Sequence, residues 1–302
     1  MIHRLWIYQR ERFPLLANGA LVAVLTAASL LYAALTLGAA SSLRLDLYAA
    51  AFGVAFGLFL QLRIFDEFKD YVDDRAFRPY RPVPRGVVSL RELGAIGLLV
   101  AGMQVALTAW ISWQLLPWLA MVWIYMGLMG REFFVSRWLK AHPLIYMLSH
   151  MVITPLILLF LTAWVWLVAG AGFVPGLGWF LAASYGNGMV FEIGRKIRVP
   201  EDEEPGVETY SALWGRSGAV AAWIGAMTLA GVCMTAAATF LALAMPIAVL
   251  LGILWIGALI VAARYLQAPV HRRGAAIERY SALWTLLIYL GLIAGALAAG
   301  SF

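Results

Sequence analysis

Long runs of apolar residues, separated by short polar segments, occupy most of the chain. Each run is close to the roughly 20 residues that an α-helix needs to cross a bilayer. The runs lie at residues 14–38, 46–64, 91–113, 115–134, 144–169, 174–193, 217–242, 246–264 and 280–299. Because lipid offers no hydrogen-bond partners, a spanning segment must satisfy its own backbone groups, as a helix does. The pattern predicts an all-α polytopic membrane protein, with about nine transmembrane helices in one bundle around a lipid-accessible cavity.

Composition agrees with the pattern of apolar runs. Of the 302 residues, 63% are hydrophobic and 13% are charged, whereas a soluble domain is about half apolar and a quarter charged. No soluble domain or linker stands out between the runs, so residues 1–302 are expected to form a single transmembrane domain.

The charges predict an orientation in the membrane. Of the 22 Lys and Arg residues, all but Arg44 fall in the N-terminal tail, in alternate connections between the apolar runs, or at the run ends that border these connections. By the positive-inside rule these segments are cytoplasmic, which puts the N-terminus inside and the C-terminus outside the cytoplasmic membrane. The net charge of +6 therefore follows from membrane topology and is not a sign of nucleic-acid binding.

A cluster of carboxylates follows the second apolar run. Asp66, Asp70 and Asp74 are spaced four residues apart, so on a helix they share one face, and Glu67 lies beside them. Carboxylates so close together repel one another unless a cation lies among them. A divalent metal carrying a phosphorylated substrate is the simplest explanation.

A second charged cluster follows the sixth apolar run. Glu192 precedes Arg195 and Lys196 by three and four residues, and Arg198 and Asp202 come next. Two interpretations remain open. The carboxylates of Glu192 and Asp202 can bind metal while the basic residues grip phosphate. Alternatively, the cluster consists of ordinary ion pairs along the end of a helix.

The segment from Asp66 to Ser89 resembles the signature of the UbiA superfamily of intramembrane prenyltransferases. The similarity covers the Asn-Asp-x-x-Asp-x-x-x-Asp motif and the Arg-Pro-[Leu/Ile/Val]-Pro-x-Gly-x-x-Ser segment after it, which here begins at Arg81 and is preceded by Arg78. This sequence has Asp66 where Asn is usual and Glu67 where Asp is usual. Both replacements keep oxygen ligands for a metal.

The second cluster resembles the second family motif in part. Asp202, Gly206 and Thr209 are similar to its Asp-x-x-x-Gly-x-x-Thr ending, and Glu192 stands for its first acidic ligand. Arg198 occupies the middle acidic position, which is a clear departure from the family. Nine helices, with one motif after helix 2 and one after helix 6, also match the family arrangement.

The resemblance implies a function and its participants. UbiA-type enzymes use Mg²⁺ to bind a polyprenyl diphosphate donor and move the prenyl group to a lipophilic acceptor, often an aromatic one. Catalysis is thus expected at Asp66, Asp70, Asp74, Glu192 and Asn187. The expected metal ligands are Asp66, Glu67, Asp70, Asp74, Glu192 and Asp202. The expected substrate-binding residues are Arg78, Arg81, Arg137, Lys140, Arg195, Lys196, Arg198 and His150.

His150 and Asn187 are expected inside membrane helices. Polar groups at such depth are costly and tend to face the bundle interior or a wet cavity. Each side chain therefore either lines the acceptor pocket or makes a hydrogen bond between helices.

Two alternatives to prenyl transfer are also compatible with the sequence. Without an external acceptor, the same ionisation of the donor ends in cyclisation, as in a UbiA-type terpene cyclase. A non-catalytic transporter or scaffold is the second alternative. Transporters usually bind their ligands near the membrane midplane, whereas the charges here gather at one rim.

Overall fold

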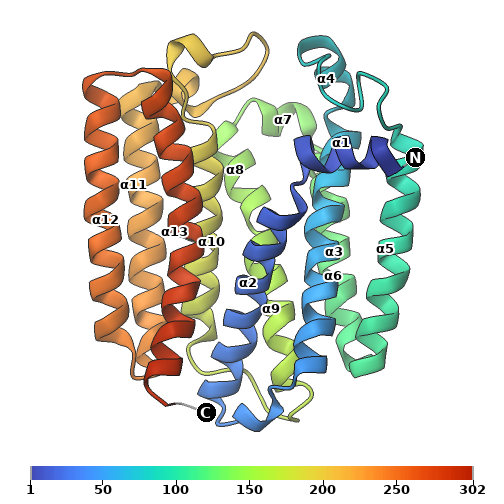
Figure 1. Cartoon of the computed structure of the whole chain (residues 1–302), viewed down its shortest axis with the longest axis vertical. Coiled ribbons are helices and arrows are strands. Elements are labelled where there is room, and N and C mark those ends of the chain that lie inside the picture. Colours follow the sequence, from blue (N-terminus) through green and yellow to red (C-terminus); the bar gives the residue numbers. More distant parts are fainter. Residues whose placement is uncertain (1, 301–302) are drawn as a thin grey trace.

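The protein is a bundle of long helices in the computed structural model, which describes residues 2–300 (Figure 1). No β-strand occurs within these residues. The helices are α1 (Ile2–Arg12), α2 (Leu15–Thr36), η1 (Ala40–Ser42), α3 (Leu45–Lys69), α4 (Tyr71–Phe77), α5 (Leu90–Ile111), η2 (Trp113–Leu115), α6 (Leu116–Gly130), η3 (Glu132–Phe134), α7 (Ser136–Lys140), α8 (Pro143–Met151), α9 (Ile153–Trp166), α10 (Leu177–Arg195), η4 (Pro200–Asp202), α11 (Tyr210–Thr239), α12 (Ala244–Gln267) and α13 (His271–Ala298).

The structure confirms an all-α polytopic membrane protein. Each predicted apolar run contains a helix of the bundle, and the run at 144–169 is divided between α8 and α9. Within residues 2–300, seven helical segments are long and apolar enough to cross a membrane, the α8–α9 pair counting as one. The 15-residue α6 and the 19-residue α10 are not among these seven. The number of nine membrane crossings is thus not confirmed.

A proline explains the division between α8 and α9. The helical run is interrupted at Val152, one turn before Pro155. Proline has no amide hydrogen to donate to the carbonyl four residues earlier, and its ring crowds that turn. The resulting kink lies close to His150, so it helps to set the position of that side chain in the bundle.

The helices form two groups that meet along α2, α9, α10 and α13. The first group contains α2 to α9 and the second α10 to α13, and contacts of α2 with α13 and of α9 with α10 join them (Figure 1). Glycines allow α10 to approach its neighbours closely. A Cβ atom on Gly186 would lie 2.9 Å from the backbone nitrogen of Ala230 on α11. Small residues of this kind let helix backbones pack tightly in membranes.

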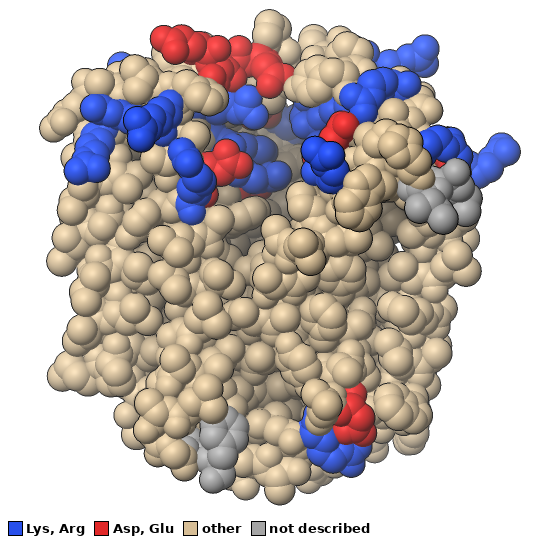
Figure 2. Space-filling model, in the orientation of Figure 1, with Lys and Arg blue, Asp and Glu red and all other residues tan. Residues whose placement is uncertain are grey.

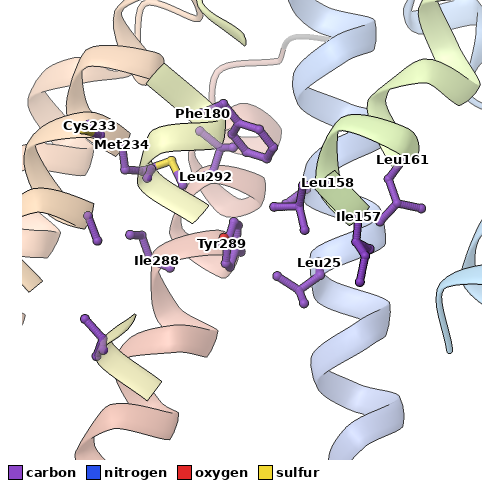
Figure 3. Close-up of a cluster of buried hydrophobic side chains, with 14 of the residues drawn as sticks. Leu25, Ile157, Leu158, Leu161, Phe180, Cys233, Met234, Ile288, Tyr289 and Leu292 are labelled. Atoms are coloured by element: carbon purple, nitrogen blue, oxygen red, sulfur yellow. The ribbon is translucent and has the colours of Figure 1, made fainter. Parts of the chain in front are cut away.

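An apolar core fills the junction between the two groups. The ring of Tyr32 on α2 stacks on Phe180 of α10 with ring centroids 4.6 Å apart, and Phe180 in turn packs edge-on against Tyr289 of α13. Leu25, Ile157, Leu158 and Leu161 approach the same region from α2 and α9 (Figure 3). The core continues toward the charged end of the bundle and forms an apolar floor below it.

Nearly all charged side chains gather at one end of the bundle. In Figure 2 they form a band around the top of the molecule, and a single acidic and basic pair lies at the bottom. That pair is Arg44 and Asp46, whose side chains are 2.7 Å apart. The asymmetry has the form that the positive-inside rule describes. Which side of the membrane this end faces stays a prediction.

Candidate functional site

The last turn of α3 brings two carboxylates and a lysine together. Asp66 and Lys69 belong to this turn, and Asp70 is the residue that ends the helix. Asp66 has a loose ion pair with Arg63, at 3.6 Å. Within residues 3–300 the Asp70 carboxylate makes no ion pair or hydrogen bond. Burial raises the pKa of Asp70; Lys69 opposes this shift, while the Asp66 carboxylate adds to it. An ionised Asp70 is therefore short of positive charge.

Asp74 is placed differently from Asp70. The helical run is broken at Asp70, so Asp74 belongs to the separate short helix α4, and the predicted acidic stripe does not follow one continuous helix. The side chain of Asp74 is buried and ion-paired with Arg78 at 3.0 Å and with Arg81 at 2.7 Å. These two arginines thus neutralise Asp74 and hold the 78–85 turn against α4.

Glu67 faces the N-terminal helix. Its carboxylate is 2.6 Å from Arg12 and 3.4 Å from Arg63, and the residue is only 2% exposed. The Arg12 contact attaches the end of α1 to α3. Because two guanidinium groups already surround it, Glu67 has the environment of a structural ion pair.

The second cluster forms the ion pairs that one interpretation of the sequence described. Glu192 lies 2.6 Å from Arg195 and 2.9 Å from Lys196, three and four residues along α10. Asp202 pairs with His271 at the start of α13, at 2.7 Å. Arg198 binds the backbone carbonyl of Asp202 and, at 3.2 Å, the carboxylate of Glu204. The carboxylates of Glu192, Asp202 and Glu204 thus all have basic partners.

The two clusters face each other across a hollow at the charged end. Figure 2 shows basic side chains gathered around this hollow. Arg195 on α10 lies within electrostatic range of Asp66 on α3. Lys69 donates a 2.7 Å hydrogen bond to the hydroxyl of Tyr146 on α8, and Lys196 lies 5.5 Å from the ring centre of Tyr210 on α11. We call this group of residues from α3, α8, α10 and α11 the polar mouth.

Arg137 and Lys140 lie on α7, at the rim of the charged end (Figure 1). Both side chains are exposed. Lys140 is 3.7 Å from Asp73, and Arg137 makes no ion pair within residues 3–300. Neither residue contacts Asp66 or Asp70, so both remain available to a ligand that enters from outside.

His150 and Asn187 are both buried in the bundle, 6% and 3% exposed. His150 stacks on the ring of Tyr146, with centroids 4.0 Å apart, and is thereby linked to Lys69 of the polar mouth. Asn187 lies deeper, on α10 beside Tyr289. Its side-chain oxygen has no hydrogen-bond partner. Of the two residues, His150 is the one that the structure connects to the mouth.

The carboxylates of the mouth are suited to a Mg²⁺ ion that is bound by only one or two protein ligands. Among the described residues, no three His, Cys, Asp or Glu side chains converge closely enough to bind one metal ion. Asp66 and Asp70 nevertheless keep carboxylate oxygens that their surroundings do not neutralise. Mg²⁺ is usually bound by one or two carboxylates together with water and substrate phosphates. These two residues fit that role better than Glu67, Asp74, Glu192 and Asp202, which have basic partners.

Three residues of this region, Lys69, Tyr146 and Glu132, were not identified as candidate site residues from the sequence. Lys69 lies between Asp66 and Asp70, and a lone lysine among carboxylates was a visible signal. Tyr146 gave none, because aromatic residues are common near membrane interfaces. Glu132, which is 6% exposed, is the one acidic residue between Glu92 and Glu192, and that isolation at the end of an apolar run was a usable clue.

Comparison with solved structures identifies the fold. The structure of a UbiA homolog from Aeropyrum pernix K1 matches with a TM-score of 0.68 and 16% identity, over 93% of this chain and 98% of that one. A digeranylgeranylglyceryl phosphate synthase matches with a TM-score of 0.60 and 16% identity, over 94% and 99% of the two chains. No family model and no curated protein matches the sequence. The chain therefore has the UbiA-type fold over nearly its whole length.

Proposed function

We propose that this chain is a Mg²⁺-dependent intramembrane prenyltransferase that moves an isoprenyl group from a diphosphate donor to a lipophilic acceptor. One observation carries the proposal: Asp70 makes no ion pair within residues 3–300, Asp66 has only a loose 3.6 Å contact with Arg63, and Arg195 on α10 lies within electrostatic range of Asp66 at the mouth of an apolar bundle. The UbiA-type fold supports it, since one structure of that fold is a digeranylgeranylglyceryl phosphate synthase.

The residues of the mouth have complementary tasks in this proposal. Mg²⁺ bound by Asp66 and Asp70 would offset the negative charge of the diphosphate. Lys69 and Arg195 supply further positive charge from α3 and α10, where it stabilises the leaving group as the bond to the prenyl carbon breaks. Arg137 and Lys140 at the rim meet the diphosphate as it enters.

The apolar core below the mouth has a separate task. Met189, Val190 and Ile193, on the turns of α10 next to Glu192, are buried apolar side chains. A prenyl cation formed at the mouth is protected from hydrolysis when it faces such a surface. The isoprenyl group and the acceptor are both apolar, so they reach the site from the membrane.

The test measures Mg²⁺-dependent binding and turnover of labelled geranyl, farnesyl and geranylgeranyl diphosphates by the purified protein in nanodiscs. Asp70→Asn removes the carboxylate that lacks a partner. Asp73→Asn is the matched control. Asp73 is exposed, and its contact with Lys140, at 3.7 Å, is loose. We expect Asp70→Asn to abolish diphosphate release and Asp73→Asn to leave most of it.

The products decide the reaction class. Diphosphate release that requires an acceptor and yields a prenylated acceptor supports the transferase. Release without an acceptor, with a cyclic product, would replace it by a cyclase. Absence of Mg²⁺-dependent binding of all three donors would overturn the proposal.

A further inference from the structure

The last three helices, α11 to α13, have a one-sided charge. Residues 209–302 contain a single acidic residue, Glu278. Their five arginines are Arg216, Arg264, Arg272, Arg273 and Arg279. Within residues 3–300 none of these five arginines forms an ion pair, whereas seven arginines of residues 3–140 do. The protein therefore leaves the positive charge of this region uncompensated.

Four of the five arginines lie around the junction of α12 and α13. Arg264 is in the last turn of α12, and Arg272 and Arg273 are in the first turn of α13. The guanidinium of Arg273 donates a hydrogen bond to the backbone carbonyl of Arg264, which ties the two helix ends together. Arg279 follows Arg272 by seven residues, or two helical turns, so the two share one face of α13. We call Arg264, Arg272, Arg273 and Arg279 the basic corner.

The shared face of Arg272 and Arg279 points outward from the bundle. Both side chains are exposed, whereas Ile277 and Ser281 of the same helix are buried. Glu278 is on another face of α13, where it lines the cavity beside loop 200–208. Figure 2 shows basic side chains grouped at the upper left, where α12 ends and α13 begins in Figure 1. The basic corner is thus separate from the polar mouth.

The guanidinium groups of the basic corner have nitrogens to spare. Arg279 uses its Nε atom for a 3.1 Å hydrogen bond to the carbonyl of Ala275, and its two terminal nitrogens have no partner within residues 3–300. Arg264 and Arg272 donate no hydrogen bond within the same residues. Clustered cations repel one another unless an anion lies among them. Phosphate is the anion that the planar guanidinium fork matches best among common biological groups.

The surroundings of the basic corner identify the source of the phosphate as a lipid. Helix α12 lies at the edge of the bundle (Figure 1), and only 17% of its most apolar stretch is buried inside the protein. Leu266 and Val270, which are 39% and 45% exposed, lie between Arg264 and Arg272 in the chain. Arginine clusters beside the end of a membrane helix attract anionic lipid headgroups. The exposed apolar residues suit acyl chains, for which a soluble phosphate has no counterpart.

We propose that the basic corner binds the headgroup phosphate of an anionic phospholipid whose acyl chains lie along α12 and α13. The lipid comes from the leaflet that surrounds the charged end of the bundle. A zwitterionic phospholipid also carries a phosphate, but the arginines repel its ammonium group, so a headgroup with net negative charge is preferred. The site does not depend on the proposed function, because it lies outside the polar mouth.

The test is a competition between two lipids for the purified full chain in a neutral detergent. Dioleoylphosphatidylglycerol and dioleoylphosphatidylcholine are offered in equal amounts, and native mass spectrometry counts the molecules of each that stay bound. The two lipids have the same acyl chains and differ in headgroup charge. We expect the wild-type protein to prefer phosphatidylglycerol by about tenfold or more, since each arginine near an anionic headgroup contributes about fivefold. The double variant Arg272→Gln/Arg279→Gln should lose most of this preference.

A second double variant, Arg10→Gln/Arg91→Gln, is the matched control. Both of its arginines are exposed and lack an ion pair within residues 3–300, and Arg91 is the second residue of α5 as Arg272 is of α13. The control removes the same charge from the same end of the molecule, so it should keep the preference. Thermal unfolding of each variant verifies that it is folded.

Three outcomes would overturn the inference. The first is equal retention of the two lipids by the wild-type protein. The second is a preference in Arg272→Gln/Arg279→Gln as large as that in the control variant. The third is displacement of phosphatidylglycerol by inorganic phosphate beyond that by chloride at equal ionic strength, which would make a soluble anion the ligand. The experiment uses neither a diphosphate donor nor Mg²⁺, so its failure is distinguishable from failure of the proposed function.

Discussion

The hydroxyl of Tyr80 donates a 2.8 Å hydrogen bond to Oε2 of Glu204, a residue 124 positions further along the chain. The bond connects the segment after α4 to the segment after η4, directly above the polar mouth. Arg198 holds the other oxygen of Glu204 at 3.2 Å, and Phe77 lies against Gly206. The two charged loops are therefore joined to each other as well as to their own helices.

Acid should release this connection. The hydrogen bond from Tyr80 lowers the pKa of Glu204, with a further contribution from Arg198. A carboxylate with a lowered pKa stabilises the folded form above its unfolded pKa, and this stabilisation is lost as the pH falls through the folded-state value. We expect faster hydrogen exchange and faster limited proteolysis of loop 200–208 as the pH drops below about 4.5, the ordinary pKa of glutamate. Tyr80→Phe should show part of this sensitivity at neutral pH, and an unchanged loop in that variant would contradict the role of the bond.

A second prediction concerns Gly206, which has φ +74°. A Cβ atom at this position would lie 2.5 Å from Phe77. Gly206→Ala therefore introduces both backbone strain of about 1–2 kcal/mol and a clash of about 1–3 kcal/mol. Gly86→Ala is the control, because Gly86 has φ +77° and open space around its Cα. Thermal unfolding should show the larger loss for Gly206→Ala, and equal losses would exclude a contribution from the Phe77 contact.

A third prediction compares two ion pairs of the N-terminal helix α1. Arg12→Ala leaves the buried Glu67 with Arg63 alone, at 3.4 Å. Removing one partner of a buried pair costs about 3–5 kcal/mol, and the remaining Arg63 contact puts the expectation at the lower end. Arg4→Ala breaks an exposed pair with Glu92 and should cost at most about 1 kcal/mol. Thermal unfolding in one detergent compares them; similar losses would mean that Glu67 is solvated when Arg12 is absent.

A fourth prediction separates Asp70 from Asp74. Asp74 is buried between Arg78 and Arg81, so Asp74→Asn should lower the free energy of unfolding by about 1–3 kcal/mol, the cost of unsatisfied charged partners. Asp70 has no such partner, so Asp70→Asn should leave stability unchanged or raise it, because burial already disfavours the ionised carboxyl. Mg²⁺-dependent binding of the donor should be lost in Asp70→Asn. Destabilisation by Asp70→Asn equal to that of Asp74→Asn would contradict the distinction.

The sequence was informative wherever a local pattern was sufficient. Every predicted apolar run contains a helix, because a segment in lipid has to satisfy its own backbone hydrogen bonds. The charged end could be predicted from the positions of the basic residues, because only one of them, Arg44, lies at the other end. The UbiA-type signature between Asp66 and Ser89 also agreed with the fold of the solved structures.

The sequence could not assign partners to the charged residues. From its spacing alone, Glu192 could be either a metal ligand or an ion-pair partner of Arg195 and Lys196. In the structure Glu192 forms ion pairs with both basic residues. Glu67 and Asp74 belong to the same motif as Asp70, yet the approach of α1 and the turn at 78–85 provide them with arginines. A site residue differs from its neighbours through these contacts, which arise from segments distant in sequence.

The sequence by itself determined that the chain is helical, lies in a membrane and carries its charges at one end, because hydrophobicity and backbone hydrogen bonding act over a single segment. Only the tertiary structure decided which carboxylates remain without a partner. Asp70 and Glu132 have no ion pair within residues 3–300 although they are shielded from solvent, whereas Glu201 and Glu208, which also have none, are exposed. Charge pairing and burial depend on the distances between helices, and these distances are set by packing across the whole bundle.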